Sequence, residues 1–148
     1  MARVKPIAVV RNEDIEAALA EGRQYLAGSL NKPQSLQHLE DGELEVGLSV
    51  YPTDTVDAAH QHARAREYQY VLAGRLDILE LGTGTVHTLR TGDFYVIERQ
   101  TAYAQRVSAG TRVLFWKHPG GNDKAAVELT PEQRAWQDAP RSHWDEDR

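Results

Sequence analysis

Apolar and polar residues alternate in a series of short segments between residues 43 and 117. The clearest case is "ELEVGLSVY", in which four apolar residues share one face: Leu44, Val46, Leu48 and Val50. Such a period of two is typical of a strand with one buried face. "RLDILEL", "VHTLR", "FYVIE", "YAQRV" and "TRVLFWK" continue the series, with glycine turns between several of them. We therefore predict six to eight strands.

No helical pattern interrupts these strands, so the long crossovers that parallel pairing needs have no place in the segment. The pattern predicts an antiparallel barrel, either closed or made of two sheets. We divide the chain into an N-terminal helix and arm (1–42), the barrel (43–117) and a C-terminal tail (118–148). A chain of 148 residues suits a single domain with a substantial core.

The flanking segments have a different texture. "RNEDIEAALAEG" predicts a short helix that Asn12 caps and Gly22 ends, and the residues from there to 42 lack a clear pattern. In the tail, "TPEQRAWQ" predicts a second helix, begun by a capping box of Thr130 and Gln133 with Pro131 at its first position. We expect the last residues of the tail to be disordered.

Composition and charge narrow the function. The formal net charge of −5 gives no general attraction to phosphate backbones, which argues against a nucleic-acid binder. The chain has no cysteine, so disulfides and thiolate ligands are excluded and any metal must be held by nitrogen and oxygen. The apolar run near the N-terminus is too short for a signal peptide or a membrane span. We expect a soluble cytoplasmic protein.

Candidate chemistry is concentrated in "HQHARAREYQYVLAG", residues 60–74. His60 and His62 project to the same side of a strand, and two imidazoles are about half of a common metal site. The short spacer "ARAR" lets the next strand begin beside the first, which brings the Glu67 carboxylate to the same point. From Glu67 the inward face continues through Gln69. At the end of the stretch, Gly74 permits the backbone angle of a tight turn.

This stretch resembles the first motif of the cupins, a superfamily of small double-stranded β-helix (jelly-roll) barrels. That motif is His-X-His, three or four residues, Glu, six residues and Gly. The resemblance covers about residues 43–117 and implies an all-β fold. It also implies that His60, His62 and Glu67 bind one divalent metal ion, with zinc or iron favoured and nickel or manganese possible.

The second cupin motif is only half present. "GDFYVIERQTAY" begins with the expected Gly92, but Tyr103 stands where the family has its fourth ligand, a histidine. A neutral phenol is a poor ligand because its ordinary pKa is about 10. Tyr103 therefore binds as a phenolate if the metal lowers that pKa, or it acts as an acid or base on a bound substrate. Gln105 faces the same way and could contact substrate.

"GDFYVIERQTAYAQRV" is also similar to the second half of the ectoine synthases, small cupins that close a ring by losing water. In that family a Glu, a Tyr and a His surround the metal, and Glu67 and Tyr95 match the first two. This similarity makes Tyr95 a second candidate for proton transfer. We predict that Tyr51 contacts substrate together with Gln69 and Gln105. Tyr51 lies on the alternate face of its strand, near the barrel mouth.

We therefore predict a metal-dependent small-molecule enzyme that uses the metal as a Lewis acid and a tyrosine as proton donor. A non-redox biosynthetic step fits best: a cyclase, lyase, isomerase or N–N bond-forming enzyme. An Fe(II) dioxygenase is an alternative, because two histidines and a carboxylate also suit that metal. A metabolite- or sugar-binding cupin without catalysis is another. We expect a homodimer, in which the early strand "ELEVGLSVY" pairs across a two-fold axis.

Overall fold

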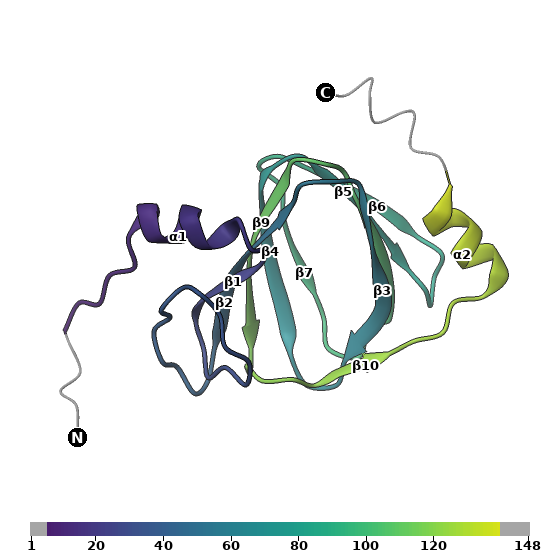
Figure 1. Cartoon of the computed structure of the whole chain (residues 1–148). Helices are drawn as coiled ribbons and strands as arrows, with labels where there is room; N and C mark the ends of the chain where they lie inside the picture. The colour runs from purple at the N-terminus through teal and green to yellow at the C-terminus, as the bar shows by residue number, and fades with distance from the viewer. Residues whose placement is uncertain (1–5, 140–148) are drawn as a thin grey trace.

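The computed structural model describes residues 6–139, which form a β-barrel with a short helix on either side (Figure 1). The barrel consists of two five-stranded antiparallel sheets. In order across the first sheet, here sheet A, the strands are β1 (Gln24–Ala27), β2 (Glu45–Tyr51), β9 (Thr111–His118), β4 (Arg66–Ala73) and β7 (Phe94–Ile97). Across the second, sheet B, they are β10 (Lys124–Ala126), β3 (Thr55–His62), β8 (Tyr103–Val107), β5 (Arg75–Glu80) and β6 (Val86–Arg90).

This architecture confirms the all-β jelly-roll prediction. The eight strands from β2 to β9 span residues 45–118, one residue beyond the end of the segment in which the alternating pattern predicts them. Two further strands come from outside that range: β1 pairs with β2, and β10 pairs with β3. The expected disorder at the end of the tail lies outside the described residues. No helix within residues 6–139 has both the length and the apolar character needed to cross a membrane.

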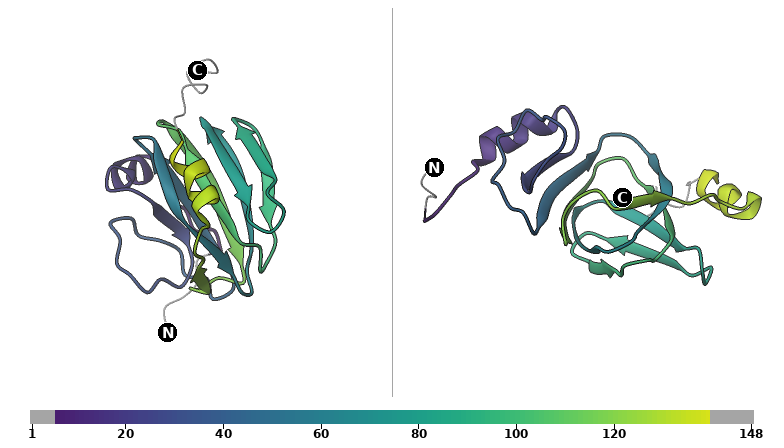
Figure 2. Two further views of the ribbon diagram at one scale, coloured as in Figure 1. Left: turned by 90° about the vertical axis from the view of Figure 1, so that its right-hand side faces the viewer. Right: turned by 90° about the horizontal axis from the view of Figure 1, so that it is seen from below.

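The two helices lie on opposite sides of the barrel (Figure 2). Helix α2 (Pro131–Asp138) begins as predicted, with a complete capping box of Thr130 and Gln133. Helix α1 (Asn12–Leu19) differs from the prediction, because Arg11 and not Asn12 is its N-cap and no side chain caps it. Arg11 is the last extended residue, so Asn12 is already inside the first turn and cannot serve as the cap.

Strand β2 turns its polar face inward. Glu45, Ser49 and Tyr51 line the interior of the barrel, whereas the apolar residues of the same strand face outward. Gly47 leaves room for the ring of Phe115 on the neighbouring strand, since a side chain at Gly47 would collide with that ring. One end of the barrel interior is therefore free to become a polar cavity.

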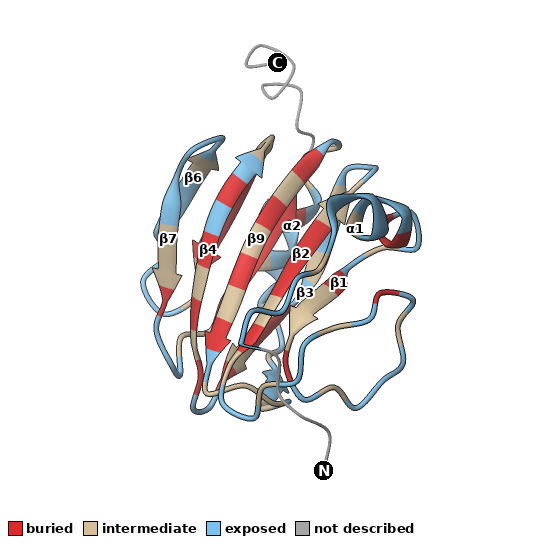
Figure 3. Cartoon of the chain, turned by 90° about the vertical axis from the view of Figure 1, so that its left-hand side faces the viewer, coloured by how far each residue is buried: buried red, intermediate tan, exposed pale blue. Residues whose placement is uncertain are grey.

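The apolar core fills the other end of the barrel. Its buried members are Val71, Leu76, Ile78, Ile97, Tyr103, Val107 and Val113. Gly74 makes the tight turn expected after the first motif, with a φ of +91°, and its backbone packs against Thr111. Along β9 and β4, buried residues alternate with more exposed ones, as expected for strands with one face toward the barrel interior (Figure 3).

The expected pairing of β2 across a two-fold axis is wrong. Strand β2 lies inside sheet A, and both of its edges are hydrogen-bonded, to β1 on one side and to β9 on the other. It therefore has no free edge to offer a second chain. The edge strands of sheet A are β1 and β7.

Candidate active site

A cavity of about 490 Å³ opens between the two sheets. Six of the residues that the sequence predicts for the site lie on its wall together with Tyr103: Tyr51, His60, His62, Glu67, Gln69 and Gln105. A volume of this size is within the range of sites for small organic ligands. The structure therefore brings these seven predicted residues together on the wall of one cavity.

The two histidines are fixed through their outer ring nitrogens. His60 donates from Nδ1 to the carbonyl oxygen of Ala58 at 2.9 Å, and His62 donates from Nδ1 to Oδ1 of Asp123 at 2.8 Å. The ring centroids of His60 and His62 are 5.2 Å apart. Both Nε2 atoms therefore carry a lone pair when the rings are neutral and are turned toward the cavity, as in histidines that bind metals.

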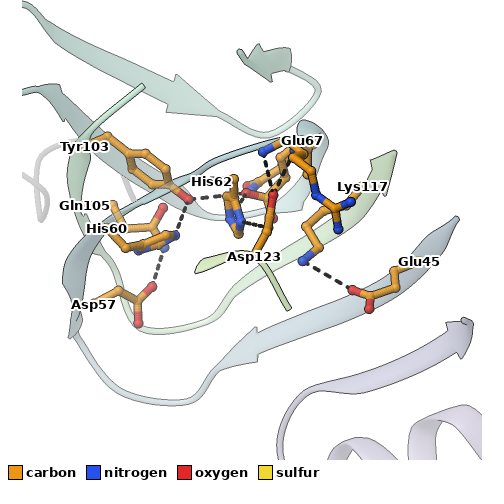
Figure 4. A network of polar contacts seen from close by, with 12 residues as sticks. Glu45, Asp57, His60, His62, Glu67, Tyr103, Gln105, Lys117 and Asp123 are labelled. Carbon is orange, nitrogen blue, oxygen red and sulfur yellow. Dashed lines mark hydrogen bonds and ion pairs between the residues drawn. The ribbon is translucent and has the colours of Figure 1, made fainter. Parts of the chain in front are cut away.

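Tyr103 links this pair to Glu67 (Figure 4). Its hydroxyl oxygen is 2.9 Å from Nε2 of His60 and 3.2 Å from Oε2 of Glu67. The same carboxylate oxygen is 3.6 Å from Nε2 of His62. Four polar side chains from β3, β4 and β8 thus converge on one point, which we call the His–Glu–Tyr centre.

The protonation states at this centre follow from burial. Burial raises the pKa of the Tyr103 hydroxyl well above its ordinary value, and the negative charge of Glu67 adds to the effect. Burial also lowers the pKa of His60, so its ring is neutral at neutral pH. Tyr103 thus holds one proton between two acceptors, His60 and Glu67, and can donate it to only one of them at a time.

Asp123 is a part of the site that the sequence did not indicate. Besides His62, its carboxylate accepts hydrogen bonds from the backbone N–H groups of Arg64 and Ala65, at 2.8 and 2.9 Å. Burial alone would raise the pKa of Asp123, but these hydrogen bonds lower it to about 2. The ionised carboxylate holds the His62 ring in the tautomer that leaves Nε2 free.

The donor set fits a divalent cation. Two imidazole nitrogens and a carboxylate oxygen face one another with a single phenol proton among them, so the centre is rich in lone pairs and poor in protons. These are ligand types that zinc and iron accept. In residues 6–139, however, no three His, Asp or Glu side chains are close enough together to hold a metal as they stand. The Tyr103 hydroxyl lies between His60 and Glu67, where it competes for their lone pairs.

Tyr95 is placed differently from the prediction that made it a proton donor. It is not part of the cavity wall, and its hydroxyl donates a short hydrogen bond to Oε1 of Gln69. Burial raises its pKa well above the ordinary value, so the phenol stays neutral. In this position Tyr95 orients the Gln69 amide, which does line the cavity.

A second polar group lies further along the same wall. Gln105 donates a short hydrogen bond to Oδ2 of Asp57, and the Tyr51 hydroxyl is 3.4 Å from that oxygen. Burial and the charge of Asp57 raise the pKa of Tyr51. Asp57 reaches the cavity because β3 has an irregularity between Asp57 and His60, which places both residues on the inner face although they are three positions apart.

Basic residues complete the cavity wall. Lys117 contacts Glu45 at 3.4 Å and donates to the carbonyl oxygen of Gly121 at 2.9 Å. Arg23, which precedes β1, donates from Nε to the Ser49 hydroxyl at 2.8 Å. No sequence pattern indicates Arg23, because this residue lies in the stretch without a clear pattern.

Comparisons with known proteins agree with this architecture. A model of the cupin domain matches residues 47–115. An uncharacterised protein with a double-stranded β-helix domain from Klebsiella pneumoniae aligns over 68% of this chain and 89% of its own, with 20% identity and a TM-score of 0.53. KdgF from Halomonas sp. aligns over 68% of this chain and 80% of its own, with 20% identity and a TM-score of 0.53.

The DMSP lyase DddQ from Ruegeria pomeroyi is also similar in structure. It covers 74% of this chain and 52% of its own, with 22% identity and a TM-score of 0.54. At these identities the likeness shows the fold. No curated protein matches the sequence.

Proposed function

Because the chain belongs to the cupin superfamily, we propose that its His–Glu–Tyr centre binds one divalent metal and catalyses a step on a small molecule in the cavity. The step is non-redox: an elimination, a ring closure, an isomerisation, or an N–N bond formation in which one nitrogen carries a hydroxyl that leaves as water. The residues at the centre support the proposed chemistry, and the similarity to cupins supports the presence of a metal.

One observation carries the proposal. The Tyr103 hydroxyl, with its proton retained by burial, lies 2.9 Å from an imidazole nitrogen and 3.2 Å from a carboxylate oxygen on the wall of the cavity. A neutral phenol between two acceptors is suited to passing a proton to a substrate atom and recovering it. It is less suited to ligating a metal, which would require the deprotonated form that burial disfavours.

The roles of the residues follow. A bound divalent metal would polarise a carbonyl or carboxylate of the substrate. His60, His62 and Glu67 would hold it, with Asp123 and the Ala58 carbonyl fixing the two rings. Tyr103 would give its proton to the oxygen or carbon that gains charge in the reaction. The Gln69 amide, held by Tyr95, would orient the substrate beside the centre.

A metabolite-binding protein without metal is a second candidate, and one observation favours it. In the present arrangement the Tyr103 hydroxyl already engages His60 and Glu67, so the centre has hydrogen-bonding partners without a cation. This candidate predicts ligand binding that does not change when metal is removed.

The experiment uses metabolite profiling. Wild-type protein, metal-depleted protein and the Tyr103→Phe variant are incubated with a mixture of small carboxylates and carbonyl compounds, and the products are followed by mass spectrometry. The proposal expects a product that forms with the metal-loaded protein, is lost on depletion and returns with metal. Its mass should equal the mass of its substrate, or the summed mass of two joined substrates, in either case less any fragment that leaves. A product carrying added oxygen atoms would point to the dioxygenase instead.

A further inference from the structure

Arg23 is exposed to solvent, but it is held in a defined position on the cavity wall. Its Nε donates to the Ser49 hydroxyl at 2.8 Å, and its guanidinium carbon lies 5.0 Å from the centre of the Phe115 ring. Phe115 in turn occupies the space that Gly47 leaves open. The guanidinium is therefore anchored by a hydrogen bond at one edge and by a ring against one face.

The other buried or partly buried charged groups of the cavity have partners, whereas Arg23 has no carboxylate; Lys32 and Lys124 also line the cavity, but both are exposed. Lys117 pairs with Glu45, Asp57 accepts from its neighbours on the same wall, and Glu67 belongs to the His–Glu–Tyr centre. Within residues 6–139, no Asp or Glu side chain lies within ion-pair distance of the Arg23 guanidinium. The Tyr51 hydroxyl also interacts with the guanidinium, and its remaining N–H donors are available to a ligand.

An anchored guanidinium with free N–H donors suits a planar anion. Two parallel N–H donors match the two oxygens of a carboxylate, or two of a phosphate, and a guanidinium that is already oriented loses little freedom on binding. An ordinary surface arginine is either solvated or paired with a nearby acid. Arg23 is exposed, but its contacts with Ser49 and Phe115 on the cavity wall distinguish it from that case.

The strand register places this anchor at some distance from the His–Glu–Tyr centre. Phe115 pairs with Gln69 across β9 and β4, and Gln69 is two residues beyond Glu67 on β4. Two residues of a strand span roughly 7 Å. A molecule held by Arg23 would therefore reach the centre with its opposite end.

We propose that Arg23 is a specificity-determining residue that binds a carboxylate or phosphate group of the substrate and so directs the other end toward the His–Glu–Tyr centre. The substrate class is a small acid that carries its reacting carbonyl several bonds from the anionic group. The part that concerns the reacting end rests on the proposed function. The anion contact itself does not.

The test is a ligand titration of the full-length protein, in which the NMR signal of the Arg23 Nε–H group reports binding. The probes are 5-oxohexanoate, its methyl ester, 2-hexanone and inorganic phosphate. We expect 5-oxohexanoate to shift the Arg23 signal saturably, and the ester and the ketone to bind at least about tenfold more weakly because they lack the charge. Saturation by phosphate but not by the oxoacid would identify the anion as a phosphate.

Variants make the assignment specific. Arg23→Gln should weaken binding of the preferred anion at least about tenfold. Arg23→Lys should also weaken this binding, because lysine keeps the charge but lacks the two parallel N–H donors of the guanidinium. The control is Arg64→Gln, which removes an exposed arginine outside the cavity wall and should leave the affinity unchanged. Melting temperatures of all three variants check that they are folded.

Two results would overturn the inference: neither anion produces a saturable shift at Arg23, or a folded Arg23→Gln variant binds the anion as tightly as the wild type. The same titration on the metal-depleted His62→Ala variant separates this inference from the proposed function. Anion binding that persists there and still depends on Arg23 keeps the anchor, even if metal-dependent turnover is never found.

Discussion

Of the residues in the cavity, Tyr103 is the one whose replacement should affect the reaction most directly. Its neutral hydroxyl contacts both His60 and Glu67, so Tyr103→Phe removes the proton and leaves the candidate ligands in place. We expect turnover to fall by about 100- to 10,000-fold, the usual contribution of a general acid or base, while metal affinity is retained. Steady-state rates on the substrate found by profiling, together with metal titration, measure the two effects.

The matched control for this change is Tyr25→Phe. The Tyr25 ring lines the same cavity and packs edge-on against Phe115, away from the His–Glu–Tyr centre. Its rate should stay within a few-fold of the wild type. If Tyr103→Phe were as active as the control, Tyr103 would be a packing residue and the proton-transfer role would be lost.

The residues that sequence analysis found and those it missed differ for a physical reason. His60, His62, Glu67 and Gln69 obey strict alternation within two consecutive strands, β3 and β4, which lie in opposite sheets, and the structure places all four on the cavity wall. Asp57 breaks the alternation, because the irregularity in β3 shifts its side chain to the inner face. A bulge leaves no reliable trace in a hydrophobic pattern.

Among the elements, the segment leading into β10 holds part of the site through Asp123. Its carboxylate joins His62 of β3 to the backbone of Arg64 and Ala65 in the following turn. Asp123→Ala should destabilise the fold by about 1–3 kcal/mol, because partly buried donors lose their acceptor. It should also lower metal affinity about 10- to 100-fold, since the His62 ring is no longer oriented. Chemical denaturation and metal titration measure these two effects.

Asp41→Ala is the control for Asp123→Ala. The Asp41 carboxylate also accepts two backbone hydrogen bonds, from Glu43 and Leu44, but it contacts neither histidine. A loss of stability with unchanged metal affinity is expected. Equal metal affinity in the Asp41 and Asp123 variants would show that Asp123 only closes a turn.

Element prediction succeeded where the pattern was long and failed where it was short. The strands from β2 to β9 carry alternation or glycine turns, and the capping box marks the start of α2. Strands β1 and β10 have four and three residues, too few for a period to be recognised. Each of them forms because it pairs with a sheet edge made by another part of the chain. The local sequence does not show that such an edge is available.

For the whole molecule, the separation of the apolar core from the polar cavity determines what metal removal does. Several core residues, among them Val71, Leu76 and Val107, do not line the cavity, whereas Tyr103 and Val113 belong to both the core and the cavity wall. We expect metal-depleted protein to stay folded, and bound metal to raise the melting temperature by mass action. Circular dichroism of the depleted protein is the measurement, and the spectrum of an unfolded chain would make the metal structural.

The predicted homodimer is also a property of the whole molecule. With β2 excluded as an edge, the outer face of sheet A is the surface that suits a second copy: Tyr70, Leu72 and Phe94 are 38%, 42% and 54% exposed. Next to them, the rings of Tyr68 and Trp116 stack 5.5 Å apart. A contiguous exposed apolar surface of this kind is typical of an interface.

We expect sedimentation to give a dimer for the wild type and a monomer for Phe94→Ser. Val86→Ser serves as the control, because Val86 is 42% exposed on β6, in the other sheet, and its replacement should leave the dimer intact. A wild-type protein that sediments as a monomer at high micromolar concentration would contradict the homodimer.

The central claim is that His60, His62 and Glu67 bind one divalent metal while Tyr103 remains a protonated neighbour. Titration calorimetry of zinc into the metal-depleted protein tests it most directly. The account predicts one equivalent bound by the wild type, an affinity at least as high in Tyr103→Phe, where the competing hydroxyl is gone, and no stoichiometric binding in the folded His60→Ala, His62→Ala double variant. Full binding by the double variant would contradict the claim.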